Sequence, residues 1–471
     1  MFELHHLTAT EQWAWLQRGD VTPTELAEHY LARIARLDPD LGAFITVTAD
    51  AALARAGWLE AEPARAAPLW GLPFGDKDLS RRAGVRTTFG SRLLENHVPD
   101  ESDEIVEVLD AAGGVSLGKT NAPEFGLPSY TETLVAPPAR TPWNTSLGAG
   151  GSSGGAAVAV AAGLLPFAPG SDGGGSIRIP AAATGLVGLK PGRGLVPSGS
   201  GLASLGGLVT TGPIARTVAD AAMLLDAMVG GSPYLFSVRA PAWDGGPLMN
   251  AAARGEGRFQ LGVMSTSPWD NAYDVVISAE AAAAVDIAVA ELNALGHGID
   301  EVALEPDDSY APAFRTLWQA GAAGIPAENG ELELLEPLTR WLVARGRELS
   351  ARDLGDALLA LTLYERSVIR QFASFDAVLT PSLALTPRPL GWYDASDAER
   401  NFAQQVVYTP FTSFVNVAGL PAITLPVAQT ADGLPMGVQL IGRPGGEHVL
   451  LSIGAQLERR LAWHLRHPPQ W

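Results

Sequence analysis

Two glycine-rich stretches that carry serines decide how this chain is interpreted. Residues 150–155 read GGSSGG, and residues 170–178 read GSDGGGSIR. Glycine permits sharp turns and a close approach of the backbone because it has no side chain, so a serine inside such a stretch is open to a small substrate. One glycine–serine cluster is usually a flexible loop. Two clusters joined by an apolar segment are much harder to explain in that way.

The bulk composition describes an ordinary globular chain. Its 471 residues are 47% hydrophobic and 18% charged, so it can bury a large core. The net charge of −19 opposes binding to nucleic acid. There is no cysteine, which excludes thiol catalysis, thiolate metal sites and disulfides. No signal peptide is evident, and the apolar run 156–169 is too short to span a bilayer. We therefore expect a cytoplasmic protein without nucleic-acid or membrane partners.

Helical and strand patterns alternate along the chain. Helical periodicity is predicted for residues 22–37, 103–112, 153–162, 217–228, 278–295 and 447–461, and short apolar runs predict strands at 115–117, 164–168, 186–189, 376–379, 422–426 and 436–441. This order predicts the α/β class, with a large mixed, mostly parallel twisted sheet covered by helices on both faces. We expect a single domain over 1–471, with a catalytic core at 65–230, a variable substrate-binding region at 235–400 and a surface connection at 232–256.

Two familiar motifs match this sequence in the wrong context. Residues 113–120, GGVSLGKT, fit the phosphate-loop pattern, which needs a strand before it and a helix after it. Here a helix is predicted before the motif and a strand within it. Residues 150–154 fit the nucleophile elbow G-x-S-x-G, but the preceding residues 143–148 read as a loop rather than a buried strand. The histidines show no metal-ligand spacing, so we expect no metal and no cofactor.

Lysine is rare in this chain, and this rarity suggests a base. Only three lysines accompany many arginines: Lys77, Lys119 and Lys190. Biased codon usage accounts for most of this bias, yet a buried lysine can lose its proton whereas arginine effectively cannot. To act as a neutral base near pH 7, a lysine needs its pKa lowered by roughly 3 units through burial and neighbouring groups. Lys77, in the stretch GLPFGDKD at 71–78, is the natural candidate.

The second glycine stretch can supply the rest of an amide-cleaving site. Amide hydrolysis needs a nucleophile, a base that later protonates the leaving nitrogen, and donors for the oxyanion. Ser176 is the candidate nucleophile, and Ser152 could relay a proton between it and Lys77. The backbone N–H groups expected to form the oxyanion nest belong to Gly173, Gly174 and Gly175.

These stretches, with five others, resemble the amidase signature family. The further segments are 118–125 (GKTNAPEF), 188–191 (GLKP), 212–220 (GPIARTVAD), 419–422 (GLPA) and 433–439 (GLPMGVQ). Together they extend the resemblance over about 65–230 and 405–460. The resemblance implies a Ser–cis-Ser–Lys triad with Ser176 as nucleophile, Ser152 as bridging serine and Lys77 as base. An acyl-enzyme would then release a carboxylate and ammonia or an amine.

The resemblance also bears on the supporting residues. Ser153 lies beside the bridging serine, and Asp172 and Arg178 are expected to form a structural salt bridge that holds the loop. Gly173 departs from the family, which commonly has threonine or another side chain there. We expect substrate contacts from residues 129–133, 310–345 and 400–415.

The resemblance leaves more than one function open. A stand-alone bacterial amidase, including the cyclic-oligoamide type, is favoured, with a small-molecule amide as substrate and a homodimer as assembly. The A subunit of a tRNA-dependent amidotransferase is the main alternative, although residues 198–211 do not resemble that version. A non-catalytic binding protein on an amidase scaffold is a further alternative. Nothing in the sequence names the acyl group.

Overall fold

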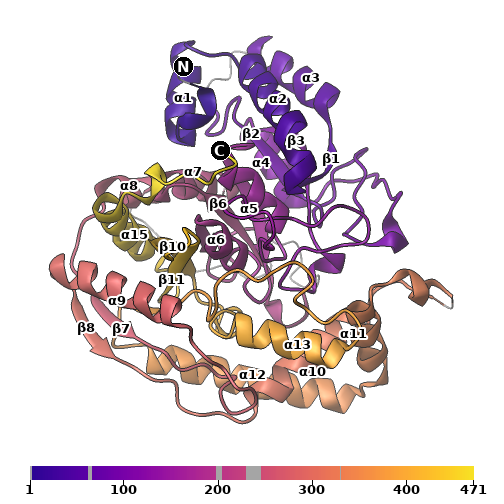
Figure 1. Cartoon of the computed structure of the whole chain (residues 1–471), viewed down its shortest axis with the longest axis vertical. Helices are drawn as coiled ribbons and strands as arrows, with labels where there is room; N and C mark the ends of the chain where they lie inside the picture. The colour runs from indigo at the N-terminus through magenta and orange to yellow at the C-terminus, as the bar shows by residue number, and fades with distance from the viewer. Residues whose placement is uncertain (1–2, 62–65, 198–203, 230–245, 329) are drawn as a thin grey trace.

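The computed structural model describes residues 3–61, 66–197, 204–229, 246–328 and 330–471 (Figure 1). Residues 198–203 and 230–245 lie outside the described residues, as does therefore part of the segment 198–211 and of the expected surface connection at 232–256. The helices are α1 (Ala9–Arg18), α2 (Pro23–Leu41), α3 (Ala49–Ala61), α4 (Glu104–Ala111), α5 (Gly154–Ala161), α6 (Arg178–Thr184), α7 (Val218–Val229), α8 (Leu248–Arg254), α9 (Ala279–Ala294), α10 (Tyr310–Ala322), α11 (Pro337–Glu348), α12 (Ala351–Gln371), α13 (Ala398–Tyr408), α14 (Ser413–Val417) and α15 (Glu447–Leu461). The strands are β1 (Phe44–Val47), β2 (Pro73–Lys77), β3 (Val115–Thr120), β4 (Phe167–Asp172), β5 (Val187–Lys190), β6 (Thr210–Ala215), β7 (Gln260–Val263), β8 (Gly298–Glu301), β9 (Ala377–Pro381), β10 (Ala422–Gln429) and β11 (Pro435–Gly442).

The predicted α/β class with a mixed sheet is confirmed, but the sheet is not mostly parallel. Its strand order is β4-β6-β5-β10-β11-β9-β7-β8. The pairs from β4 to β9 are antiparallel, and β7 pairs in parallel with both β9 and β8. The connection β4–α6–β5 does give two strands of the same direction. However, β6 inserts between them and runs the other way, and β10 and β11 form a hairpin, so a strand–helix–strand order here does not produce parallel neighbours.

A smaller sheet brings the N-terminal part of the chain to the edge of the large one. It has the order β1-β3-β2, with β2 and β3 parallel, and β2 contacts β4. Lys77 is the last residue of β2, and Ser171 and Asp172 are the last two residues of β4. The contact between these two edge strands therefore places the candidate base beside the second glycine stretch.

Alternate residues of β10 face two helical layers. Gly188 of β5 pairs with Thr424, and a Cβ added at Gly188 would lie 2.6 Å from the Cβ of Ala181, so this face carries α6. The next residue of β10, Leu425, lies on the opposite face against α15, where a Cβ added at Gly454 would be 3.3 Å from Leu425 Cδ2. Helices α7, α9 and α15 pack on the sheet and α15 contacts the other two. The sheet is thus covered on both faces, as predicted.

Helix α2 forms where the sequence predicts it. Thr22 accepts a hydrogen bond from the Glu25 N–H and the Glu25 side chain accepts one from the Thr22 N–H, while Pro23 occupies the first helical position. Strand β4 is displaced from the predicted 164–168. It continues into the glycine stretch because residues 167–172 pair in unbroken register with β6. Low strand propensity of glycine and serine is overridden there by this long-range pairing.

The structure agrees with the exclusion of the phosphate loop at 113–120 and of the nucleophile elbow at 150–154. Residues 113–120 begin after α4 and continue as β3, and the Lys119 ammonium donates to the Ser80 carbonyl from within that strand region. Residues 141–149 form turns and isolated bridges, so no strand leads into the G-x-S-x-G match. The chain therefore has neither a phosphate loop nor a nucleophile elbow at these positions.

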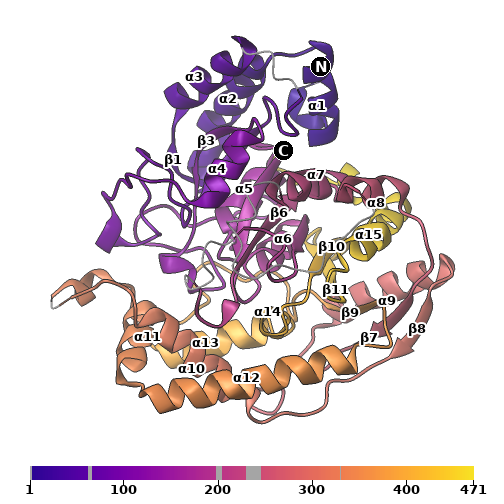
Figure 2. The same cartoon turned by 180° about the vertical axis from the view of Figure 1, so that it is seen from behind.

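The two ends of the molecule are built from different parts of the chain. Helices α1, α2 and α3 lie at one end, and α10, α11, α12 and α13 gather at the other, in both views (Figures 1 and 2). In the described part of the chain, no helix has the length and apolar character needed to cross a bilayer.

Candidate active site

Lys77 reaches the serines from the edge of the small sheet. Its Nζ donates to Ser152 Oγ at 2.8 Å, to Ser171 Oγ at 3.0 Å and to the Ser171 carbonyl at 3.2 Å. The side chain is only 2% exposed. Burial lowers the pKa of Lys77 to about 7, with the Asp172 carboxylate acting in the opposite direction. A sizeable fraction of this amine is therefore neutral near pH 7, as a general base requires.

The first glycine stretch turns sharply at the bridging serine. The Gly151–Ser152 peptide bond is cis, as the family resemblance implies. A Cβ added at Gly151 would lie 2.7 Å from the backbone of Tyr130, so only glycine fits this contact. Ser153 then joins the two stretches, because its N–H donates to the Ser176 carbonyl at 3.1 Å and its Oγ contacts the Ser171 backbone at 3.3 Å.

Ser176 lies two residues before α6 and faces a pocket. It is 8% exposed and lines that pocket together with Gly174. Its hydroxyl makes no hydrogen bond to any residue that the structure describes, so Lys77 and Ser152 are brought into direct contact whereas Ser152 and Ser176 are not hydrogen-bonded. The Ser176 hydroxyl is therefore available to a molecule in the pocket.

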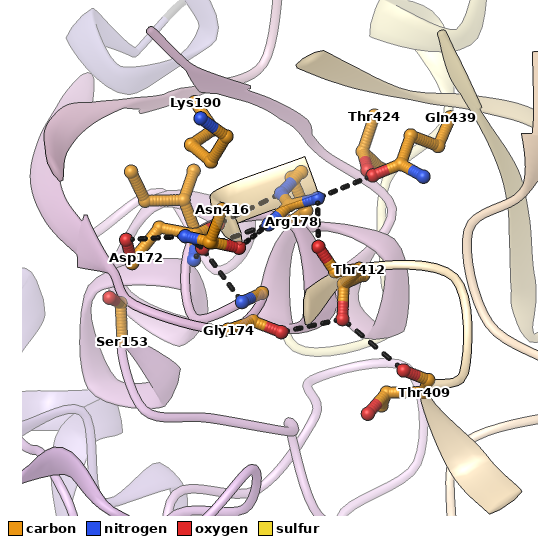
Figure 3. A network of polar contacts seen from close by, with 12 residues as sticks. Ser153, Asp172, Gly174, Arg178, Lys190, Thr409, Thr412, Asn416, Thr424 and Gln439 are labelled. Atoms are coloured by element: carbon orange, nitrogen blue, oxygen red, sulfur yellow. Dashed lines mark hydrogen bonds and ion pairs between the residues drawn. The ribbon is translucent and has the colours of Figure 1, made fainter. Parts of the chain in front are cut away.

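Asp172 and Arg178 form the expected salt bridge, and it lies at the centre of a buried network (Figure 3). Arg178 Nε and Nη2 each donate to one carboxylate oxygen of Asp172 at 2.9 Å, and both side chains are fully buried. Although burial opposes ionisation, the Arg178 guanidinium holds the pKa of Asp172 well below its usual range. Arg178 also donates to Gln439 Oε1, Asn416 Oδ1 and the Thr412 carbonyl. The pair anchors the glycine loop to the C-terminal strands.

Hydrogen bonds to the carbonyls of the loop orient its N–H groups. Asn416 Nδ2 donates to the Asp172 carbonyl at 2.9 Å, and the Ile179 N–H donates to the Gly175 carbonyl at 2.7 Å. In a trans peptide the C=O and N–H point in opposite directions. The N–H groups of Gly173 and Ser176 therefore point away from Asn416 and Ile179 respectively.

The N–H group of Gly175, the third glycine of the expected oxyanion nest, already has a hydrogen-bond acceptor within the protein. The Gly175 N–H donates to Asp172 Oδ1 at 2.7 Å, so the prediction that it would be aimed at an anion needs correction. The carbonyl of the same peptide group, that of Gly174, is held as well, because Thr412 Oγ1 donates to it at 2.6 Å. The N–H groups of Gly173, Gly174 and Ser176 donate to no residue in the described ranges. These three groups are therefore the candidates for binding an oxyanion.

The pocket beside Ser176 has an empty volume of about 490 Å³, including its open mouth. Three segments expected to contact substrate contribute to it: 129–133 through Ser129, 310–345 through Phe314 and Trp318, and 400–415 through several residues. The lining residues are Leu127, Pro128, Ser129, Gly174, Ser176, Ile179, Trp269, Phe314, Trp318, Phe402, Gln405, Val406, Thr409 and Ser413.

Comparison with known proteins identifies the family. The profile of the Amidase family matches residues 25–451 of this chain. The chain belongs to the amidase family. The protein named "Putative amidase AmiB2" of Mycobacterium tuberculosis is 37% identical, over 98% of this chain and 97% of that protein. The A subunit of the glutamyl-tRNA(Gln) amidotransferase of Roseiflexus sp. is 36% identical, over 99% and 98% respectively.

Solved structures of the family share this fold over nearly the whole chain. A 6-aminohexanoate cyclic dimer hydrolase complexed with substrate superposes with a TM-score of 0.91 at 30% identity, covering 99% of both chains. A bacterial aryl acylamidase of the amidase signature family superposes with a TM-score of 0.84 at 25% identity, covering 98% of this chain and 97% of that one. This amidase is therefore an enzyme of the amide-hydrolase class.

The sequence did not point to every residue at the site of this amidase. Ser171 lies inside the second glycine stretch, 170–178, but only the structure shows that it supplies two further acceptors to Lys77. Asn416 and Thr412 precede the GLPA segment without a pattern of their own, and Trp269 comes from a loop after β7 that has no motif.

Within the described residues, Lys77 is the one lysine of the three that reaches serine hydroxyls. Lys190 is as deeply buried, and its Nζ donates to the Pro191 carbonyl at 2.9 Å. Burial, aided by Arg178, lowers the pKa of Lys190 to about 7 while Asp172 opposes this. A depressed pKa alone therefore does not single out a candidate base, and the contact with Ser152 is what distinguishes Lys77 from Lys190.

Proposed function

We propose that this amidase hydrolyses amides through an acyl-enzyme at Ser176, with Lys77 as base and Ser152 as proton relay. The observation that carries the proposal is the 2.8 Å hydrogen bond between the buried Lys77 Nζ and Ser152 Oγ, beside a pocket lined by Ser176. In this proposal residues 65–230 carry the catalytic machinery, and residues 235–400 contribute to substrate binding through side chains such as Trp318.

The chemistry runs in two halves. Neutral Lys77 takes the proton of Ser152 as Ser152 takes that of Ser176, and Ser176 Oγ attacks the amide carbonyl carbon. The N–H groups of Gly173, Gly174 and Ser176 donate to the oxyanion. The proton returns through Ser152 to the leaving nitrogen, the C–N bond breaks, and ammonia or an amine departs. Water then attacks the acyl-enzyme by the same relay, which releases the carboxylate and restores Ser176.

The proposal includes a cytoplasmic homodimer that acts on small-molecule amides without nucleic acid or membrane. The net charge of −19 and the lack of a basic run support the absence of a nucleic-acid partner. Light scattering on the purified protein measures the assembly, and a mass of one chain would remove the homodimer from the proposal.

The A subunit of a tRNA-dependent amidotransferase is the second candidate, because relatives of that name are similar over the whole chain. A free glutamine substrate carries an ammonium and a carboxylate, which need charged or strongly polar partners when they leave water. Among the described residues that line the pocket, none is charged. A stand-alone amidase is therefore favoured, and turnover by the purified chain without a partner protein would distinguish the two.

The test is a set of three alanine variants with a matched serine control. Ser176→Ala should lower kcat by roughly 10⁴-fold or more, and Ser152→Ala and Lys77→Ala should cost nearly as much, because residues that act as a unit are not additive. Ser146→Ala, an exposed turn serine, should retain wild-type turnover.

A fluorophosphonate probe separates this proposal from a non-catalytic binding protein. The probe should label Ser176 in the wild-type chain and label nothing in Ser176→Ala. Full turnover by Ser176→Ala on every amide that the wild type cleaves would refute the proposal.

A further inference from the structure

Aromatic rings form the wall of the pocket that lies against Gly173 and Gly174. Phe314 and Trp318 lie one turn apart on α10, with their rings stacked at 5.5 Å between centroids and 16° between planes. Trp269 meets Phe314 edge to face at 5.5 Å and 83°. Phe402 of α13 lies 6.5 Å from Trp269, also edge to face. Such packed rings present a stiff apolar surface rather than an adaptable one.

The rings of α10 lie directly against Gly173 and Gly174, two glycines of the proposed oxyanion loop (residues 172–176). A Cβ added at Gly174 would be 3.8 Å from Phe314 Cζ and 3.9 Å from Trp318 Cη2. A Cβ added at Gly173 would be 3.7 Å from Trp318 Cη2 and 3.1 Å from Val209 Cγ2. The absence of side chains at these two positions leaves the ring edges beside the peptide groups that would hold the oxyanion. Whatever acyl group reaches Ser176 therefore has these rings for neighbours.

The hydroxyl of Ser413 in the pocket is already used by the protein. It accepts a hydrogen bond from Trp269 Nε1 at 3.0 Å and shares another with the Tyr310 hydroxyl at 2.8 Å. These contacts also fix the orientation of the Trp269 ring. Ser413 thus contributes more to the position of the aromatic wall than to the hydrogen bonds of a ligand.

The amide of Gln405 is used in the same way. Its Oε1 accepts from the Ser129 N–H at 2.7 Å, and its Nε2 donates to Asn401 Oδ1 at 2.8 Å. The Thr409 hydroxyl donates to the Gln405 carbonyl at 3.0 Å. The side chains of Ser413, Gln405 and Thr409 therefore have protein partners before any ligand enters.

An ionised acyl group would leave water for this pocket without a counter-charge. None of the described lining residues is acidic or basic, and burying an unpaired charge is costly whereas an apolar group gains from the transfer. We infer that the acyl group bound here is uncharged and apolar, and that Trp318 is the residue that selects a flat, ring-bearing acyl group. This inference rests on the proposed acyl-enzyme at Ser176 and names the substrate class of that site.

Matched pairs of amides test the charge requirement. Hexanamide is compared with adipamate, in which a carboxylate replaces the terminal methyl, and phenylacetamide with 4-carboxyphenylacetamide, which carries a carboxylate on the ring. Two quantities are measured: kcat/KM for ammonia release, and the concentration that protects Ser176 from fluorophosphonate labelling. The neutral member of each pair should be favoured by at least roughly 100-fold in kcat/KM or in protection.

The outcomes separate the two claims. Equal treatment of the pair, a preference for the carboxylate, or no effect of any of the four compounds overturns the inference. Selective protection by the neutral compounds without release of ammonia from any amide would instead overturn the proposed hydrolysis and leave the pocket assignment intact.

A tryptophan substitution with a matched control tests the role of Trp318. In Trp318→Ala, kcat/KM for phenylacetamide should fall about 10-fold, mainly through KM, while that for acetamide should change less than about 2-fold. Loss of folded enzyme would lower both values equally, so the ratio between the substrates reports the ring contact. Trp58→Ala, at a 52% exposed position on α3 at the other end of the molecule, should leave both values unchanged. An unaltered phenylacetamide-to-acetamide ratio in Trp318→Ala would overturn the selective role.

Discussion

We expect the Thr412 hydroxyl to fix the geometry of loop 172–176, whose N–H groups are proposed to bind the oxyanion. Thr412 is fully buried and its Oγ1 donates to the Gly174 carbonyl at 2.6 Å, while the Thr409 carbonyl lies farther away at 3.2 Å. The Gly174–Gly175 peptide is thereby held from both sides, because the Gly175 N–H donates to Asp172. Thr412→Val removes the hydroxyl at almost constant volume and tests this clamp without opening a cavity.

The size of the effect follows from what the substitution leaves unpaired. A buried carbonyl that loses its hydrogen bond costs about 1–3 kcal/mol. Gly174 is partly exposed to the pocket, where water can reach it, so the lower end, about 1 kcal/mol, is expected for the loss of folding stability. If the same free energy is lost from the transition state, kcat falls about fivefold. KM should stay near its wild-type value, because the oxyanion is formed only during the reaction.

The assay combines urea unfolding with steady-state kinetics on one neutral amide. Thr412→Ser keeps the hydroxyl and should retain most of the wild-type kcat. Thr184→Val is the matched control, since the buried Thr184 hydroxyl donates to the Pro180 carbonyl at 2.7 Å within α6; it should lose stability at most and keep kcat. A folded Thr412→Val enzyme with kcat within twofold of wild type would show that this hydroxyl does not position the loop.

Two further predictions concern charge. Because burial lowers the pKa of Lys77 to about 7 and only the neutral amine accepts a proton, kcat/KM should rise with pH through a midpoint near 7 and level off above it. Steady-state rates from pH 5 to 9 measure this, and a profile flat across that range would contradict the role of Lys77. Arg178→Met should destabilise the fold by about 3–5 kcal/mol, because it leaves the buried Asp172 carboxylate unpaired. In the wild type, the depressed pKa of Asp172 means that stability is lost as pH falls below the ordinary carboxyl range. In the variant, burial acts to raise that pKa, so stability should instead fall as pH rises above the ordinary carboxyl range, as unfolding titrations would detect.

Much of the local structure could be read from the sequence. The capping box at Thr22 and the 3.6-residue periodicity of α2 are properties of neighbouring residues, so they predict a helix without knowledge of the fold. The candidate base was also chosen from the sequence: a lysine kept in an arginine-rich chain suggested a site where deprotonation matters, and the Lys77 amine contacts Ser152. Lys190 shows the limit of that reasoning, because it is equally buried yet its amine donates to a backbone carbonyl and, among the described residues, to no serine.

Strand order was not predictable from local patterns. The alternation of strands and helices is the same whether β6 lies outside β5 or between β4 and β5, and the choice depends on long-range pairing. The same pairing extends β4 through Gly170 and Ser171, residues that local propensity assigns to a loop. The orientation of the Gly175 N–H likewise depends on Asp172 being drawn into a network with Asn416, a residue far away in the sequence.

Asp172 also acts on the pKa of Lys77, the proposed base. Lys77 donates to three neutral oxygens, on Ser152 and Ser171, and forms no ion pair with any residue in the described part of the chain. Asp172 is the nearby carboxylate that raises the pKa of Lys77, but burial outweighs it, and the pKa is lowered to about 7. Lys77 therefore combines burial with neutral hydrogen-bond partners, the setting that the proposed transfer of a proton from Ser152 requires.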